Sequence, residues 1–354
     1  MKEIINYKES LEIFRKYISD KNNISEDSIK KLYQAFQGVK EVQDLDLKEL
    51  FNIENEDDIK NKIFFMQSNE IKKIAKKLKR NKQYIGALEV AKKYAKLKKE
   101  EEKQNFDFQN FAQDTITNLS TIIKTFERYY NKFTSSKNKS IVYSIIDKLE
   151  TRACPYCNLN YIDVIRKKGG TILRPALDHF YPKSKYPFFA LSFFNLVPTC
   201  YECNSSLKRD KDEKDLLNPF NDDFDNLAKF TVSLSGGGQL NHALSDISSF
   251  NIELNSRTKN NKGIVNKQNE CFALNERYRY RKEEASEILS KCILDTPEFR
   301  KEIKKVFPTV SEQYIEKLIY GNSLSCEEIN KRPLAKMTCD LVDFYKTSVK
   351  KDDR

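Results

Sequence analysis

The chain has 354 residues, and its 63 Lys and Arg against 52 Asp and Glu give a formal net charge of +11 at pH 7. This length predicts two or three domains with a sizeable core in a soluble, cytoplasmic protein, because the most apolar stretch, residues 187–198, is too short to cross a membrane. The excess of positive charge favours a polyanionic partner, although a lysine-rich genome would give the same excess for compositional reasons alone.

Residues 1–136 are predicted to form a helical domain that serves interaction or nucleic-acid binding. Apolar residues recur at spacings of three and four in several segments, for example from Ile4 to Ile18 and from Ile116 to Phe133. This period is typical of amphipathic helices. Proline is absent before Pro155. We therefore expect a bundle of helices joined by short polar connections.

Within this domain, residues 72–103 carry a dense run of basic side chains together with an apolar stripe. The run has two interpretations: a helix face that binds phosphates, or an ordinary solvated face with surface charge. Three consecutive glutamates, Glu100 to Glu102, close the run and favour the second interpretation.

The sequence changes character after residue 136. Residues 137–222 hold paired cysteines, and residues 223–354 are predicted to pack on them as a β-hairpin followed by helices. The hairpin is expected because apolar and polar side chains alternate over 229–234 and over 250–254, with a turn at Gly236 to Gly238 between them. One long amphipathic helix is predicted next, from about Cys271 to Cys292.

Four of the eight cysteines form two Cys-x-x-Cys pairs, Cys154 with Cys157 and Cys200 with Cys203. Two identical spacings that bracket one compact unit predict four thiolate ligands for a single structural Zn²⁺. A zinc ion with four thiolates has no open position for a substrate, so this ion is not expected to be catalytic. The remaining cysteines lie in helical patterns, where a small buried apolar role is usual: Cys271, Cys292, Cys326 and Cys339.

The polar residues of a candidate active site lie between and after these pairs. Asp178 and His179 follow a predicted strand at 171–173. Asn195 opens a second short strand, and the helix that begins with the second cysteine pair carries Asn204. The order is therefore strand, loop, strand, helix.

The pattern D-H-x-x-P-x-S, followed by N-L-V-P-x-C-x-x-C-N-x-x-x-K, resembles the HNH, or ββα-metal, endonuclease family in its version with four zinc-binding cysteines. The resemblance covers residues 150–210 and keeps the family's order and approximate spacing. The last motif position is Asn204 where the family name has His, which makes this an HNN variant. Two further phrases, at 151–157 and 272–278, are similar to HNH proteins of bacterial antiphage systems, including the HNH subunit of Septu-type systems, which works with an ATPase partner.

The resemblance implies an α+β, mostly helical fold with a zinc-stapled ββα-metal core, and it implies a role for each polar residue. His179 is the general base that deprotonates the attacking water. Asp178 is a ligand of a catalytic Mg²⁺ or Mn²⁺, and Asn204 supplies an amide oxygen, which suits these hard cations better than imidazole. Asn195 hydrogen-bonds the backbone and fixes the loop that carries the base. Basic residues near the site are candidates for holding the substrate phosphates: Lys183, Lys185, Lys208 and Arg209.

These features predict a metal-dependent endonuclease that hydrolyses phosphodiester bonds in DNA, as an effector of an antiphage defence system with an ATPase or another defence protein as partner. Two alternatives are open. The first keeps the site but acts on RNA, because the site residues address the phosphate and not the sugar. The second is a zinc-stabilised module that binds nucleic acid or protein and has a vestigial nuclease site, against which the intact site residues argue. The only other histidine, His242, is expected to be an incidental surface residue.

Overall fold

The structure is a computed structural model that describes residues 1–4, 6–40, 42, 45–167, 170–211, 216–234 and 247–349. The predicted turn at Gly236 to Gly238 and the expected surface residue His242 lie outside these residues. None of the helices in the described ranges is long and apolar enough to cross a membrane. The protein is rich in helices and has small two-stranded sheets, in agreement with the predicted α+β class.

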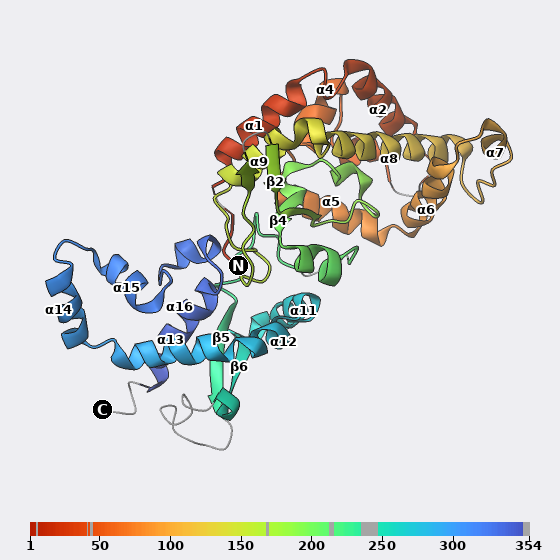
Figure 1. Ribbon diagram of the computed structural model, residues 1–354. Helices are drawn as coiled ribbons and strands as arrows, with labels where there is room; N and C mark the ends of the chain where they lie inside the picture. The colour runs from red at the N-terminus through yellow and green to blue at the C-terminus, as the bar shows by residue number, and fades with distance from the viewer. Residues whose placement is uncertain are drawn as a thin grey trace.

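The first part of the chain is helical, as its periodicity predicts, and forms the upper lobe in Figure 1. Helix α8 runs along this lobe, and α2 and α6 pack against it, while α1 packs against α9. The elements of this part are α1 (Lys8–Ser19), α2 (Glu26–Gly38), α3 (Leu47–Leu50), α4 (Glu56–Asp58), η1 (Ile59–Ile63), α5 (Ser68–Arg80), α6 (Lys82–Lys96), α7 (Glu100–Gln104), α8 (Gln113–Phe133), η2 (Ser136–Asn138) and α9 (Lys139–Lys148).

The central part holds two antiparallel strand pairs, β1 with β2 and β3 with β4, and a short helix, η5, that follows β4. Its elements are β1 (Ile165–Lys167), β2 (Gly170–Leu173), β3 (Ala176–His179), η3 (Pro187–Phe189), η4 (Phe193–Asn195), β4 (Leu196–Thr199) and η5 (Glu202–Lys208).

The last part forms the lower lobe in Figure 1, in which α16 packs on both β5 and α13. The predicted hairpin strands are confirmed: β5 and β6 pair antiparallel, with Lys229 opposite Asn255 and Leu234 opposite Phe250. The elements are β5 (Ala228–Leu234), η6 (Ile247–Ser249), β6 (Phe250–Ser256), η7 (Lys259–Asn261), α11 (Lys262–Phe272), α12 (Leu274–Tyr278), η8 (Arg279–Arg281), α13 (Lys282–Leu294), α14 (Pro297–Val306), α15 (Glu312–Tyr320), η9 (Cys326–Lys331), α16 (Ala335–Phe344) and η10 (Tyr345–Val349).

The apolar stretch before β4 joins the N-terminal helices to the central part. Aromatic side chains of η3 and η4 are buried against aromatic side chains of those helices: ring centroids lie 5.0 Å apart for Phe51 and Phe188, and 5.5 Å apart for Phe14 and Phe193. Each such pair contributes about 0.5–1.5 kcal/mol beyond the area that it buries. The hydrophobic core therefore runs without interruption across the domain boundary predicted at residue 136.

The prediction of one long helix ending near Cys292 is wrong. Helix α11 ends at Phe272, and Ala273 adopts a left-handed conformation with φ of 48°, after which α12 and α13 follow separately. A left-handed non-glycine residue costs about 1–2 kcal/mol. Tertiary contacts offset this cost, because the Phe272 ring stacks on Tyr156 with centroids 4.5 Å apart and the Tyr278 hydroxyl donates to the Cys157 carbonyl at 2.8 Å. The break turns the chain toward the paired cysteines.

Candidate functional site

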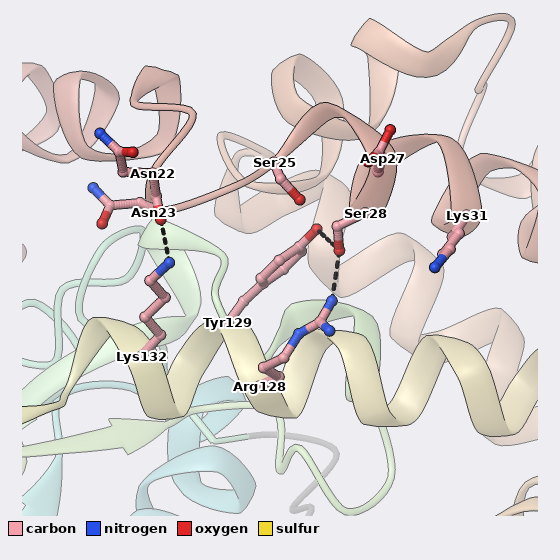
Figure 2. Close-up of a pocket in the computed structure, with 9 residues that line it drawn as sticks. All are labelled: Asn22, Asn23, Ser25, Asp27, Ser28, Lys31, Arg128, Tyr129 and Lys132. Atoms are coloured by element: carbon pink, nitrogen blue, oxygen red, sulfur yellow. Dashed lines mark hydrogen bonds between the residues drawn. The ribbon is translucent and has the colours of Figure 1, made fainter.

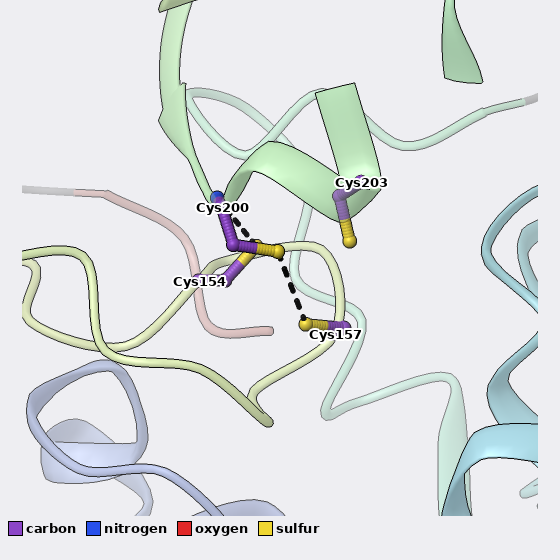
Figure 3. A group of neighbouring side chains, drawn as sticks. All are labelled: Cys154, Cys157, Cys200 and Cys203. Carbon is purple, nitrogen blue, oxygen red and sulfur yellow. Dashed lines mark hydrogen bonds between the residues drawn. The ribbon is translucent and has the colours of Figure 1, made fainter. Parts of the chain in front are cut away.

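The four paired cysteines converge, as their spacing predicts. Figure 3 shows Cys154 and Cys157 on one turn of the chain, facing Cys200 and Cys203 from the end of β4 and from η5. All four are buried, and their Sγ atoms lie within 4.8 Å of one another. The Sγ atoms of Cys157 and Cys200 are 3.9 Å apart, close to the edge of about 3.8 Å that a tetrahedron with Zn–S bonds of about 2.3 Å requires. The quartet therefore fits a four-thiolate zinc ion.

Two groups donate hydrogen bonds to the quartet, one from a distant part of the chain and one from the turn of the first cysteine pair. The Arg277 guanidinium donates to Cys203 Sγ at 3.3 Å, and the Leu159 backbone N–H donates to Cys157 Sγ at 3.4 Å. Four thiolates around one Zn²⁺ carry a net charge of about −2, which a neighbouring guanidinium partly compensates. Arg277 lies in the phrase at 272–278 that is similar to HNH proteins of antiphage systems, but residue spacing alone did not relate it to the cysteines, because the break at Ala273 brings it to them.

The candidate active-site residues lie on a strand–strand–helix unit beside the quartet. The strand predicted at 171–173 is confirmed as β2, and Asp178 and His179, which follow it, form the last two positions of a further strand, β3, opposite Val197 and Leu196 of β4. At the other end of this strand pair, Ala176 lies opposite Thr199, next to the second cysteine pair. Three residues of strand separate the two ends, about 10 Å. The four-cysteine site thus braces one end of the strand pair, and His179 lies at the other end.

His179 is held in one orientation by two contacts. Its Nε2 lies 2.9 Å from the Ala190 carbonyl oxygen, and its ring lies 4.5 Å from the ring of Tyr130 on α8. A carbonyl oxygen only accepts hydrogen bonds, so Nε2 carries the proton of the neutral ring and Nδ1 carries the lone pair. Burial, together with the charges of Lys183 and Lys208, lowers the pKa of His179 to about 4. The ring is therefore neutral at neutral pH.

Asn195 connects the two ends of the loop between His179 and β4. Its Oδ1 accepts from the Tyr181 backbone N–H at 2.8 Å, and its Nδ2 donates to the carbonyls of Tyr181 and Phe189 at 3.1 and 2.9 Å. The side chain is fully buried. These contacts are backbone hydrogen bonds of the kind that the resemblance implies for this position. They fix the segment that presents the Ala190 carbonyl to His179.

Asp178 is buried and already paired. Tyr156 donates its hydroxyl to Oδ2 at 2.7 Å, and the Lys208 ammonium donates to Oδ1 at 3.1 Å and to the His179 carbonyl at 2.8 Å. Burial raises the pKa of Asp178, although Lys208 and Tyr156 both favour the ionised carboxylate. Lys208 is itself fully buried. The structure therefore differs from the prediction that Lys208 contacts substrate phosphates, because its ammonium faces Asp178 and not solvent.

The other predicted residues surround the site with different degrees of exposure. Lys183 is exposed and lies over the Tyr130 ring, 5.1 Å from its centroid. Lys185 and Arg209 are also exposed. Asn204 is partly exposed, and its Nδ2 makes a long contact of 3.5 Å with the Ser205 hydroxyl, so its Oδ1 accepts no hydrogen bond from the described residues. Three basic side chains and one amide oxygen thus stay accessible.

Sequence reasoning missed two aromatic residues of this site. Tyr130 belongs to an amphipathic helix, where an aromatic residue indicates core packing, and nothing in that pattern relates it to a histidine that follows 49 positions later. Tyr156 lies between Cys154 and Cys157, and the Cys-x-x-Cys spacing indicates metal ligands but no role for the residue between them. Contact between these side chains and the site depends on the tertiary packing.

Compared with models of known protein families, with curated proteins and with solved structures, the chain shows no significant match to any of them. The structure supports a buried four-cysteine site that could hold a metal ion such as zinc. Within the described residues this quartet is the one place where three or more His, Cys, Asp or Glu side chains converge in this way.

Proposed function

We propose that the protein is an HNH-type endonuclease that hydrolyses phosphodiester bonds in DNA. One observation carries the proposal: His179 donates through Nε2 to a backbone carbonyl, on a strand–strand–helix unit braced by four cysteines. The described residues offer no hydrogen-bond partner to Nδ1, which keeps its lone pair available. A positioned, neutral imidazole with a free nitrogen is the group that a general base requires.

In this mechanism His179 Nδ1 takes a proton from the attacking water, a step that typically contributes about 10²–10⁴-fold. The Ala190 carbonyl holds the ring against rotation, and it stabilises the imidazolium that forms, because Nε2–H donates to it. Asn195 keeps that carbonyl in place through Phe189. Lys183 and Arg209, which are exposed beside the site, are available to hold the phosphate.

The resemblance also implies a catalytic Mg²⁺ or Mn²⁺, whose chemistry when bound is to neutralise charge on the leaving oxygen. The donor chemistry of Asp178 and Asn204, a carboxylate and an amide oxygen, suits such a cation. The surroundings of Asp178 differ from this expectation, because the Lys208 ammonium already contacts the carboxylate that would bind the cation. The two buried hydrogen bonds leave the carboxylate with unused acceptor positions, since an ionised carboxylate has about four.

The test is cleavage of plasmid DNA by the zinc-loaded wild type, by His179→Ala and by His242→Ala, each with Mg²⁺, Mn²⁺ or a chelator of divalent cations at low concentration. We expect His179→Ala to lose at least about 10²-fold in rate and His242→Ala, which removes the only other histidine, to keep the wild-type rate. Equal cleavage by wild type and His179→Ala would remove the assignment of the base. Parallel reactions with duplex DNA, single-stranded DNA and tRNA decide between the DNA and RNA substrates.

The resemblance to HNH proteins of antiphage systems motivates the further proposal that this nuclease is a defence effector with an ATPase or another defence protein as partner. Its test is co-purification of the chain with the products of the adjacent genes, followed by phage plating with wild type and His179→Ala. Equal plating efficiency on cells with either protein would contradict a role of the nuclease in defence.

A further inference from the structure

A basic groove crosses the N-terminal helices, at a distance in sequence from the candidate active site. It has a volume of about 740 Å³ and lies between α3, η1 and α5. Five of its lining residues are cationic: Lys62, Lys73, Lys76, Lys77 and Arg80. The cations from Lys73 to Arg80 belong to the first half of the lysine-rich run at 72–103. The proposed function gives this run no role.

Four of these cations form one row on α5. Lys73, Lys76, Lys77 and Arg80 recur at spacings of three and four, which places them on one face of the helix. The opposite face is held in the core by buried apolar side chains, Ile71, Ala75 and Leu78. Because the core fixes the rotation of α5, the row faces the groove in a single orientation.

Among the residues that the structure describes, the cations of this row have no carboxylate within ion-pair distance. Within the described residues Lys73, Lys76, Lys77 and Arg80 make no ion pair or hydrogen bond, although all four are exposed. The carboxylate in the lining, Glu70, accepts from the Gln67 backbone N–H at the start of α5. Like charges three and four residues apart destabilise a helix, so a row of this kind costs stability unless a ligand neutralises it.

A second basic pocket of the same lobe provides a contrast. Figure 2 shows Arg128 and Tyr129 of α8 both bonded to the Ser28 hydroxyl, at 2.6 and 2.7 Å, and Lys132 bonded to the Asn22 carbonyl. Two cations of that pocket, Arg128 and Lys132, thus hold α2 and its preceding turn on α8. The row on α5 has no such internal use.

We infer that this groove binds the phosphate backbone of the nucleic acid that the proposed nuclease cleaves, an inference that rests on that proposed function. The row from Lys73 to Arg80 covers eight residues of helix, about 10 Å, a length over which one strand of a duplex presents about three phosphates, at a rise of about 3.4 Å each along the duplex axis. A regular polyanion fits a regular row of unpaired cations better than the irregular charges of an acidic protein do.

The groove is fixed to the element that supports the candidate site. The carbonyl of Ile63, at the end of η1, accepts from the Ser192 hydroxyl at 2.7 Å, and the carbonyl of Phe64 accepts from the Phe193 backbone N–H at 3.0 Å. Ser192 and Phe193 lie three and two residues before Asn195, which holds the loop beside His179. A strand bound in the groove is therefore held on the same rigid support as the site.

The test measures DNA binding by fluorescence anisotropy over a series of salt concentrations, with His179→Ala as the common background so that cleavage does not interfere. The groove variant carries Lys73→Gln, Lys76→Gln, Lys77→Gln and Arg80→Gln. We expect weaker binding, and a slope of log K against log salt that is reduced by about 2.7, because about three phosphate contacts contribute about 0.9 each. A matched control removes four exposed charges elsewhere, with Lys137→Gln, Lys139→Gln, Lys259→Gln and Lys301→Gln, and should keep the slope. A variant with Lys73→Arg, Lys76→Arg and Lys77→Arg should keep both affinity and slope.

The outcomes separate this inference from the proposed function. An unchanged slope and affinity in the groove variant would overturn the inference even if the wild type cleaves DNA. A reduced slope with no cleavage by the wild type would support the inference and contradict the proposed function. Loss of binding to polyglutamate but not to DNA in the groove variant would also overturn it, in favour of an acidic protein partner.

Discussion

Lys208 and Asp178 form a buried ion pair in the centre of the candidate site. The Lys208 Nζ lies 3.1 Å from each carboxylate oxygen of Asp178, and neither side chain is more than 2% exposed. The ammonium compensates the carboxylate in the absence of any metal ion. A divalent cation at Asp178 would meet a charge of its own sign there, so cation binding and the ion pair are expected to be coupled.

Lys208→Met should destabilise the protein by about 3–5 kcal/mol, because it leaves a buried carboxylate with Tyr156 as its remaining partner. Asp178→Asn combined with Lys208→Met should recover most of this loss, since no uncompensated charge remains. Urea unfolding of the three proteins measures the difference. Added Mg²⁺ should raise the melting temperature of Lys208→Met more than that of the wild type. A double variant as unstable as Lys208→Met alone would contradict the role of charge.

Arg277→Leu should weaken zinc binding by about 10–100-fold, because the guanidinium that donates to Cys203 Sγ is lost. Competition with a chromogenic chelator measures the affinity. Arg279→Leu removes an exposed arginine of the neighbouring turn and serves as the matched control. Equal zinc affinity of the two variants would show that the contact with Cys203 has no effect on the metal.

Tyr130→Ala should reduce the cleavage rate on the order of 10–100-fold, because the ring that packs on His179 from α8 is removed and the imidazole loses a positional restraint. Tyr130→Phe keeps the ring and should retain most of the rate. Single-turnover cleavage of DNA compares the two. If both variants lose the same activity, the hydroxyl and not the packing of the ring is what matters.

Asn195→Ala should cost about 1–3 kcal/mol for the buried Phe189 carbonyl that loses its partner, and it also removes the partly buried hydrogen bonds with the Tyr181 N–H and carbonyl. The cleavage rate should fall as well, because the Ala190 carbonyl is then held less firmly. Thermal unfolding and cleavage are measured together. Asn226→Ala, which changes an exposed asparagine, should leave both at the wild-type level.

The stability of the last lobe should depend on pH through Asp295. Burial opposes ionisation of this carboxyl, but Arg300, which donates at 2.6 and 2.7 Å, and Tyr320, at 2.8 Å, outweigh it and hold the pKa below its ordinary value of 3.8. As the pH falls, the carboxyl of Asp295 is protonated in the unfolded chain before it is protonated in the folded one. The contribution of Asp295 to the free energy of unfolding is therefore fully present above pH 3.8, and it is lost as the pH falls through the lowered pKa. Asp295→Asn should cost about 1.5–3 kcal/mol at neutral pH and much less once the pH has fallen through the lowered pKa of Asp295. Urea unfolding at several pH values checks this, and a constant difference would contradict it.

Much of the local structure could be predicted from short-range patterns. Alternation over 229–234 and 250–254 predicted the strands of the hairpin, and helical periodicity predicted α8. The long helix ending near Cys292 was predicted wrongly, because the left-handed Ala273 is stabilised by contacts of Phe272 and Tyr278 with distant residues. The spacing of apolar residues indicates which face of a helix is buried, but it does not indicate where tertiary contacts break the helix.

The sequence by itself determined the zinc quartet, because two turns with the same Cys-x-x-Cys spacing can meet around one tetrahedral ion wherever the chain brings them together. It also determined which polar residues lie beside that quartet. Only the tertiary structure decided their surroundings: Lys208 is buried against Asp178, and Tyr130 packs on His179 from a helix that is remote in the sequence. Burial and pairing are properties of packing among distant segments. Residue type and spacing do not specify whether a lysine faces solvent or compensates a buried carboxylate.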